Sequence, residues 1–202
     1  MNNNLPSYDE LPEVFAINLN SIGATTLAGE EQIKYLQGQV TCDVASLTNE
    51  KLLNGAHCNA KGKVFSAFRL IERENKFFLI QPISSITQSL AELKKFGVFA
   101  KVEIEEDAEL SYLAIAGQQA SVKMAALFQQ VPDALSPVVH ENNTTLVYIS
   151  GNIDRYLIID KAAELSSFTT TLDCPVYNDA VWNLLEITAG FPLLSQQYVA
   201  EY

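Results

Sequence analysis

Short runs of alternating apolar and polar residues cover much of the chain and are separated by polar stretches. A period of two is typical of strands that bury one face. The pattern predicts strands at 14–20 and 24–29, a hairpin over 63–82, a short strand or turn at 55–60, and further strands at 101–107, 110–117, 144–151 and 155–160. We expect the first two strands to pair with each other across a turn at Ile22 and Gly23.

Other segments carry apolar residues at helical spacing, such as Ile86, Leu90 and Leu93. They predict helices at 29–41, 84–100, 118–130, 161–172 and 179–190. Gly38 weakens the end of the first helix, and Gly190, before Pro192, ends the last. Hairpins outnumber long crossovers, so the sequence predicts an α+β fold with mixed or antiparallel sheets and helices.

Length and composition allow one large domain or two small ones, because 48% of the 202 residues are apolar. No run of 18 uncharged apolar residues occurs, which argues against a membrane-spanning helix. Residues 1–13 are polar, hold two prolines and lack the pattern of a secretory signal, so we expect a mobile lead-in. The odd cysteine count without a CxxC motif favours free thiols over a disulfide framework.

Charge is distributed unevenly around a net value of −11, which argues against a surface built for nucleic acid. From Lys51 to Lys101 there are nine basic and three acidic residues, so this segment carries +6 and the remainder −17. Two interpretations stay open. The charges are dispersed and solvated, or they form one basic surface that faces an anionic ligand.

Residues 55–70 concentrate polar chemistry before an apolar run. A phosphate loop is excluded, because Gly62-Lys63 is followed by valine and the upstream glycine is two positions too far away. His57 and Cys58 are adjacent in an extended chain and so point to opposite sides, which disfavours both a zinc site and a Cys–His nucleophilic pair. We therefore assign no metal site and no catalytic residue, and read the stretch as a strand and turn that lead into the hairpin.

Three segments carry a resemblance to a known family: GEEQIKYLQGQVTCDV (29–44), GAHCNAKGKVFSAFRLI (55–71) and LLEITAGFPLLS (184–195). The block Y-L-Q-G-Q-V-T at 35–41, followed by Asp43, is the most specific. The chain resembles the YgfZ-type folate-binding tRNA-modifying proteins of the glycine-cleavage aminomethyltransferase (T-protein) superfamily. The similarity extends over nearly the whole chain from about residue 14.

The resemblance implies a cytoplasmic protein that binds tetrahydrofolate or a folate derivative and supports iron–sulfur enzymes of tRNA modification. It also implies an aminomethyltransferase folate-binding architecture with a ferredoxin-like unit. We expect a first folate-binding lobe at 14–110, and at 111–202 the ferredoxin-like unit with the start of the return to that lobe. The family's K-G-C-[FY]-x-G-Q-E motif and C-terminal barrel are expected beyond Tyr202, which indicates a C-terminally truncated member.

The resemblance also bears on catalysis. True aminomethyltransferases carry an Asp-Asp pair in the hairpin, and by count from Gly62 that pair falls on Ser66 and Ala67. Without a carboxylate there, general acid–base chemistry on the folate is unsupported. This favours a folate-binding accessory protein. A folate-dependent aminomethyltransferase or demethylase, and a ligand-free interaction scaffold, remain as alternatives.

The family's folate-contacting tryptophans correspond to Trp182 and to Ile22, which cannot stack on a pteridine as well. The glutamate usual before Ala-Gly corresponds to Thr188, and Glu186 lies about 200° away around the helix. A core position for Trp182 is the alternative.

The anionic tail of folate needs cationic partners. Lys61, Lys63 and Arg69 are the candidates, with a solvated strand charge as the alternative for Arg69.

Overall fold

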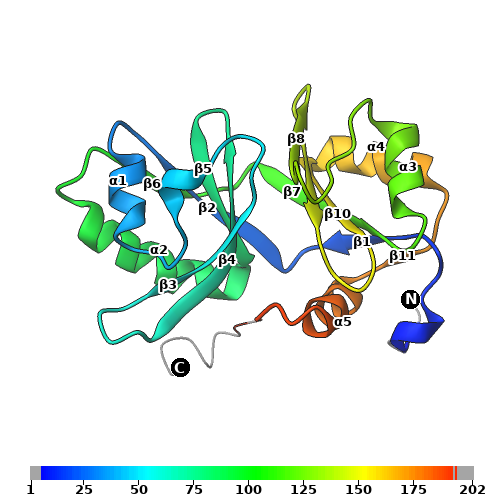
Figure 1. Ribbon diagram of the computed structural model, residues 1–202, viewed down its shortest axis with the longest axis horizontal. Coiled ribbons are helices and arrows are strands. Elements are labelled where there is room, and N and C mark those ends of the chain that lie inside the picture. The colour runs from blue at the N-terminus through cyan, green and yellow to red at the C-terminus, as the bar shows by residue number, and fades with distance from the viewer. Residues whose placement is uncertain (1–5, 193, 195–202) are drawn as a thin grey trace. The chain divides into compact units, whose positions relative to one another are not determined.

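The computed structural model describes residues 6–192 and 194, and these fall into two compact units. Unit 1 contains the described residues up to Asn20 together with Glu109–Pro192, and unit 2 contains Ser21–Ala108. Each unit is built around one sheet with its own helices (Figure 1). Residues 1–5 of the expected lead-in, and residues 193 and 195–202 of the expected return, lie outside the described residues.

Unit 1 has a six-stranded sheet in the order β11-β1-β7-β10-β9-β8. Its strands are β1 (Phe15–Leu19), β7 (Leu110–Ala116), β8 (Val138–Glu141), β9 (Thr144–Ile149), β10 (Arg155–Lys161) and β11 (Val176–Tyr177). All described pairs are antiparallel except β1 with β11. The order of β7, α3, β9, β10, α4 and β11 follows a ferredoxin-like βαββαβ unit into which β1 is inserted, between β7 and β11.

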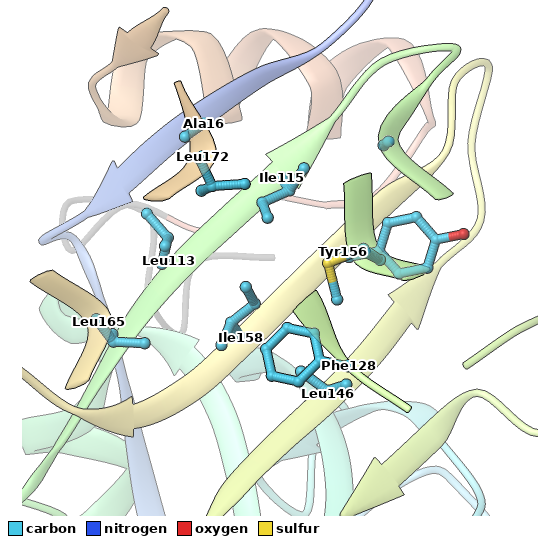
Figure 2. Close-up of a cluster of buried hydrophobic side chains, with 11 residues drawn as sticks. Ala16, Leu113, Ile115, Phe128, Leu146, Tyr156, Ile158, Leu165 and Leu172 are labelled. Carbon is cyan, nitrogen blue, oxygen red and sulfur yellow. The ribbon is translucent and has the colours of Figure 1, made fainter. Parts of the chain in front are cut away.

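Helices cover both faces of this sheet. Alternate residues of its strands, such as Ile115 on β7 and Ile158 on β10, pack with α3 (Ala120–Leu127) and α4 (Ala162–Leu172) into one buried core (Figure 2). Arg155 precedes the core residue Tyr156 on β10 and therefore points to the other face. Because Arg155 contacts α5 (Asp179–Thr188), α5 lies on that opposite face. This double cover explains why Phe15, Ala16 and Ile17 are all fully buried.

Unit 2 has a five-stranded antiparallel sheet in the order β3-β4-β5-β2-β6. Its strands are β2 (Ile22–Ala28), β3 (Leu53–Cys58), β4 (Val64–Arg73), β5 (Lys76–Pro82) and β6 (Glu103–Glu106). Helices α1 (Gln32–Gln37) and α2 (Ile83–Gly97) pack on one face, where Leu27, Leu36, Phe68 and Leu93 belong to one buried core. None of the described helices is long and apolar enough to span a membrane.

The predicted α+β class is confirmed, as is the hairpin over 63–82. Glu74 and Asn75 both take positive φ at its tip, which suits a two-residue turn between twisted strands. The predicted pairing of 14–20 with 24–29 is wrong, because β1 belongs to unit 1 and β2 to unit 2. The strands β8 and β11 and the 3₁₀ turns at Tyr8–Glu10 and Val44–Ser46 were not expected.

Candidate functional site

The sheet of unit 2 has a second face, opposite α1 and α2. Phe68 and Leu70 of β4 belong to the helix-covered core, so Ala67 and Arg69 project from the other face. Arg69 pairs in register with Ile80 of β5, and Ile80 pairs with Ala24 of β2, two residues from Ile22. We call this side of the sheet the Arg69 face and define it by Ile22, Ala67, Arg69, Phe78 and Ile80, all of which except the half-buried Ile22 are buried. It brings two of the sequence-predicted residues, Ile22 and Arg69, onto one side of one sheet.

Burial differs among the three candidate cations of unit 2. Arg69 is only 6% exposed, so it is not a solvated strand charge. Lys61 and Lys63 are exposed on the turn between β3 and β4. The side-chain oxygen of Asn59 accepts the backbone N–H groups of both lysines, at 2.8 and 3.0 Å. Gly62 between them has φ +81°, which favours glycine. The turn thus presents two lysine side chains to solvent beside β4.

Ser66 lies on the helix-covered side, away from Ala67. Its hydroxyl is fully buried and donates to Ser89 Oγ of α2 at 3.4 Å, and Ser89 Oγ lies 2.9 Å from Nδ1 of His57. Burial lowers the pKa of His57 to about 4, against an opposing effect of Glu92, so the imidazole is neutral at pH 7. The neutral imidazole and the two hydroxyls are thus joined in one buried hydrogen-bond network. We call His57, Ser66 and Ser89 the His57 cluster.

The geometry answers the question raised by residues 55–70. His57 is buried towards α2, whereas its neighbour Cys58 is half-buried, as expected for adjacent residues of a strand. Burial raises the pKa of the Cys58 thiol, which disfavours a thiolate. Cys42, Cys58 and Cys174 are all free. The stretch is therefore the edge strand β3 and a turn, and its histidine belongs to a buried hydroxyl network.

The motif at 35–41 connects α1 to its surroundings. The hydroxyl of Tyr35 donates to the carbonyl of Leu93 on α2, and burial raises the pKa of this phenol to about 12. Gln37 Oε1 accepts the N–H of Ala45 at 3.1 Å, and Thr41 Oγ1 accepts the N–H of Ala56 at 2.9 Å. These contacts hold α1, α2 and the edge of the sheet together, so the motif has a structural role in unit 2.

Trp182 lies on α5 of unit 1 and is 1% exposed. The guanidinium carbon of Arg155 lies 5.3 Å from the centroid of its ring, within range of a cation–π interaction. Arg155 Nη1 donates to Glu186 Oε1, and Nη2 donates to the carbonyl of Ser150 at 2.9 Å. Sequence reasoning did not single out Arg155. The sequence signal for a buried arginine is that Arg155 directly precedes the apolar run YLIID. A strand that is covered on both faces also buries the charged residue at its start.

Glu186 and Thr188 face in different directions on α5. Glu186 is 1% exposed and forms the buried ion pair with Arg155. Thr188 is exposed, and its hydroxyl donates to the carbonyl of Leu185 at 3.0 Å. Glu186 therefore does not take the position that the resemblance assigns to Thr188. Its carboxylate is engaged in holding α5 to β10.

Two solved structures share the fold of this chain. A glycine cleavage system aminomethyltransferase T from Bartonella henselae matches 90% of the chain with a TM-score of 0.75 at 16% identity, over 52% of its own length. A heterotetrameric sarcosine oxidase from Corynebacterium sp. U-96 matches 92% of the chain with a TM-score of 0.51 at 14% identity, over 89% of its own chain. The fold is therefore of the aminomethyltransferase T type, with mixed α+β units.

Relatives at the sequence level give the family. A protein of Colwellia psychrerythraea named tRNA-modifying protein YgfZ is 56% identical over 98% of the chain, and one of Yersinia enterocolitica with the same name is 36% identical over 96%. The chain belongs to this YgfZ family. It spans 61% and 59% of the length of these two relatives. No family model matches the chain.

Proposed function

We propose that the protein binds tetrahydrofolate or a folate derivative and serves as an accessory factor for iron–sulfur-dependent tRNA modification in the cytoplasm. The relatives named tRNA-modifying proteins and the aminomethyltransferase T fold support this proposal. The net charge of −11 is unfavourable for direct tRNA binding, so the proposed partners are the iron–sulfur enzymes of tRNA modification.

The observation that carries the proposal is the chemistry of the Arg69 face. It combines apolar side chains with one guanidinium, and Ile22 of β2 and Arg69 of β4 lie on the same side of the sheet, with β5 between their strands. Folate combines a flat heteroaromatic ring with an anionic glutamate tail. Apolar side chains suit the ring, and a guanidinium pairs with a carboxylate through two parallel hydrogen bonds. The residues of this face therefore match the ligand in chemistry, and because all but Ile22 are buried, binding requires the groups that cover them to move.

The two exposed lysines of unit 2 extend the proposed contacts. Lys61 and Lys63 suit the glutamate or polyglutamate tail, since both are exposed on one turn. Trp182 of unit 1 stays a separate prediction of a folate contact. Because it is 1% exposed and Arg155 lies over its ring, this contact requires the side chains around the ring to move.

An accessory role fits the hairpin better than a transferase role. Ser66 is fully buried towards α2, and Ala67 on the Arg69 face has no titratable group. Neither position offers the carboxylate that general acid–base catalysis needs. Tetrahydrofolate-dependent release or transfer of an aminomethyl group by the purified chain would favour the enzyme alternative. Absence of any folate binding would favour the interaction scaffold.

Titration with tetrahydrofolate is expected to give a saturable change in intrinsic fluorescence, because Trp182 is the sole tryptophan. The melting temperature should also rise with ligand concentration, since a ligand that binds only the folded state stabilises it. N-acetyltryptophanamide at matched absorbance is the control for optical filtering by the ligand. A rise in melting temperature without a fluorescence change would separate folate binding from the proposed Trp182 contact. The absence of both effects at millimolar ligand would contradict the proposal.

Replacing Lys63 by alanine is expected to weaken binding of a polyglutamylated folate and to flatten its dependence on salt. The reason is that exposed charges are screened within about 8 Å at physiological ionic strength. Lys76→Ala is the matched control, because Lys76 is exposed at the opposite end of the same hairpin. Equal salt dependence in the wild type and in both variants, measured by calorimetry, would remove Lys63 from the proposed tail site.

A further inference from the structure

A groove with a volume of about 400 Å³ lies within unit 1, between α4 and the adjoining ends of β1 and β7. It arises because α4 packs over β7 and β10, while β1 lies beyond β7 in the sheet. Leu113 and Leu165 supply apolar surface to it. Its polar lining consists of Asn18, Asn20, Ser111, Ser166, Thr169 and Thr170. The volume falls within the range of small-molecule sites.

The α4 wall of this groove offers mainly hydrogen-bond acceptors. Ser166 donates to the carbonyl of Ala162 at 2.9 Å, Thr169 to that of Leu165 at 2.9 Å, and Thr170 to that of Ser166 at 3.0 Å. A hydroxyl has one proton and two lone pairs. Because each proton is already donated to the helix, the oxygens that face the groove are left to accept. A ligand that meets this wall therefore has to be a donor.

The electrostatic setting favours a cation. Unit 1 has twelve acidic and three basic residues, and one of the three, Arg155, is buried in an ion pair with Glu186. The described residues that line the groove carry no charge of their own, so the surrounding charges of unit 1 set the electrostatic field there. Such a field raises the local concentration of cations.

We propose that this groove binds a small organic amine. An ammonium group has three donors and no acceptor, which complements an acceptor wall in an acidic unit. In the complex the ammonium donates to the hydroxyl oxygens of Ser166 and Thr170, while the alkyl part lies on Leu113 and Leu165. The site is distinct from the Arg69 face, which belongs to unit 2, so its existence does not depend on folate binding.

Calorimetric titration of the full chain with 1,4-diaminobutane tests the proposal, with 1,4-butanediol as a neutral probe of the same length. We expect the diamine to bind and the diol not to bind. Ser166→Ala combined with Thr170→Val should weaken diamine binding about tenfold or more, the effect of losing charge-assisted hydrogen bonds. Removing hydroxyls bonded to their own helix costs little stability.

Thr171→Val is the matched control. Thr171 donates to the carbonyl of Ser167 at 3.0 Å in the same way, but it does not line the groove. Unchanged affinity in this variant, with loss in the double variant and equal melting temperatures, supports the site. Absence of diamine binding, equal binding of diol and diamine, or equal affinity in the double variant and the control would each overturn it.

Discussion

Replacing Glu186 by leucine is expected to lower the free energy of unfolding of unit 1 by about 3–5 kcal/mol, the typical cost of removing one partner from a buried ion pair. Arg155 and Glu186 are each 1% exposed, and their side chains join β10 to α5. The substitution leaves the guanidinium charge buried without its carboxylate. It also disturbs Trp182, because Arg155 lies over the ring of that side chain.

Urea denaturation followed by Trp182 fluorescence measures this loss in unit 1. Glu164→Leu is the control, because Glu164 is exposed on α4, and its substitution should change stability by less than about 0.5 kcal/mol. The double variant Arg155→Met/Glu186→Leu should recover most of the loss, since well-packed apolar residues often replace a buried ion pair without cost. A change below about 1 kcal/mol for Glu186→Leu alone would contradict a stabilising role of this pair.

Acidification from pH 7 to pH 4 is expected to destabilise the wild-type protein by about 3 kcal/mol more than a His57→Gln variant. Burial lowers the pKa of His57 in the folded state from 6.5 to about 4. The unfolded chain therefore binds a proton before the folded protein does. The contribution of neutral His57 to the free energy of unfolding is fully present above pH 6.5 and is lost as the pH falls towards 4.

The groups that face His57 define the control for this experiment. Ser66 of β4 and Ser89 of α2 are uncharged, and Glu92 of α2 raises the pKa against the larger effect of burial. Carboxylates elsewhere titrate in the same range in both proteins, so only the difference between wild type and variant reports on His57. Parallel curves of unfolding free energy against pH for the two proteins would show that His57 does not titrate as described.

The spacing of apolar residues predicted most elements of this fold, because it reflects which face of a strand or helix is buried. The hairpin over 63–82 combines two apolar arms with a polar tip, and β4 and β5 form there. Helix spacing placed α2, α4 and α5 within a few residues of their ends, since each buries one apolar stripe.

The pairing of strands and side chains was harder to predict from the sequence than the type of each element. Alternation at 14–20 predicted a strand but could not name its neighbours, and β1 pairs with β7 and β11 far along the chain. The two-residue strand β11 carries too few residues for any period. Arg155 was missed because its carboxylate partner, Glu186, lies 31 positions away and is brought close only by the packing of α5 on β10.

The sequence alone predicted only part of the candidate site. The resemblance pointed to Ile22, and the charge pattern to Arg69, but only the strand register shows that both lie on one face. The same register separates Ser66 from Ala67, which local counting treats as a pair. Neighbouring strand residues face opposite sides, so a motif that is contiguous in sequence need not be contiguous in space.

Equilibrium dialysis of tetrahydrofolate against an Ile22→Asp variant tests the central claim, which is that the Arg69 face holds the folate. Ile33→Asp is the matched control, because Ile33 is 49% exposed on α1, which packs on the other side of the same sheet. A carboxylate at residue 22 places charge beneath the proposed ring, so affinity should fall about tenfold or more. The account predicts that Ile33→Asp binds as tightly as the wild type. Undiminished affinity in a folded Ile22→Asp variant would contradict it.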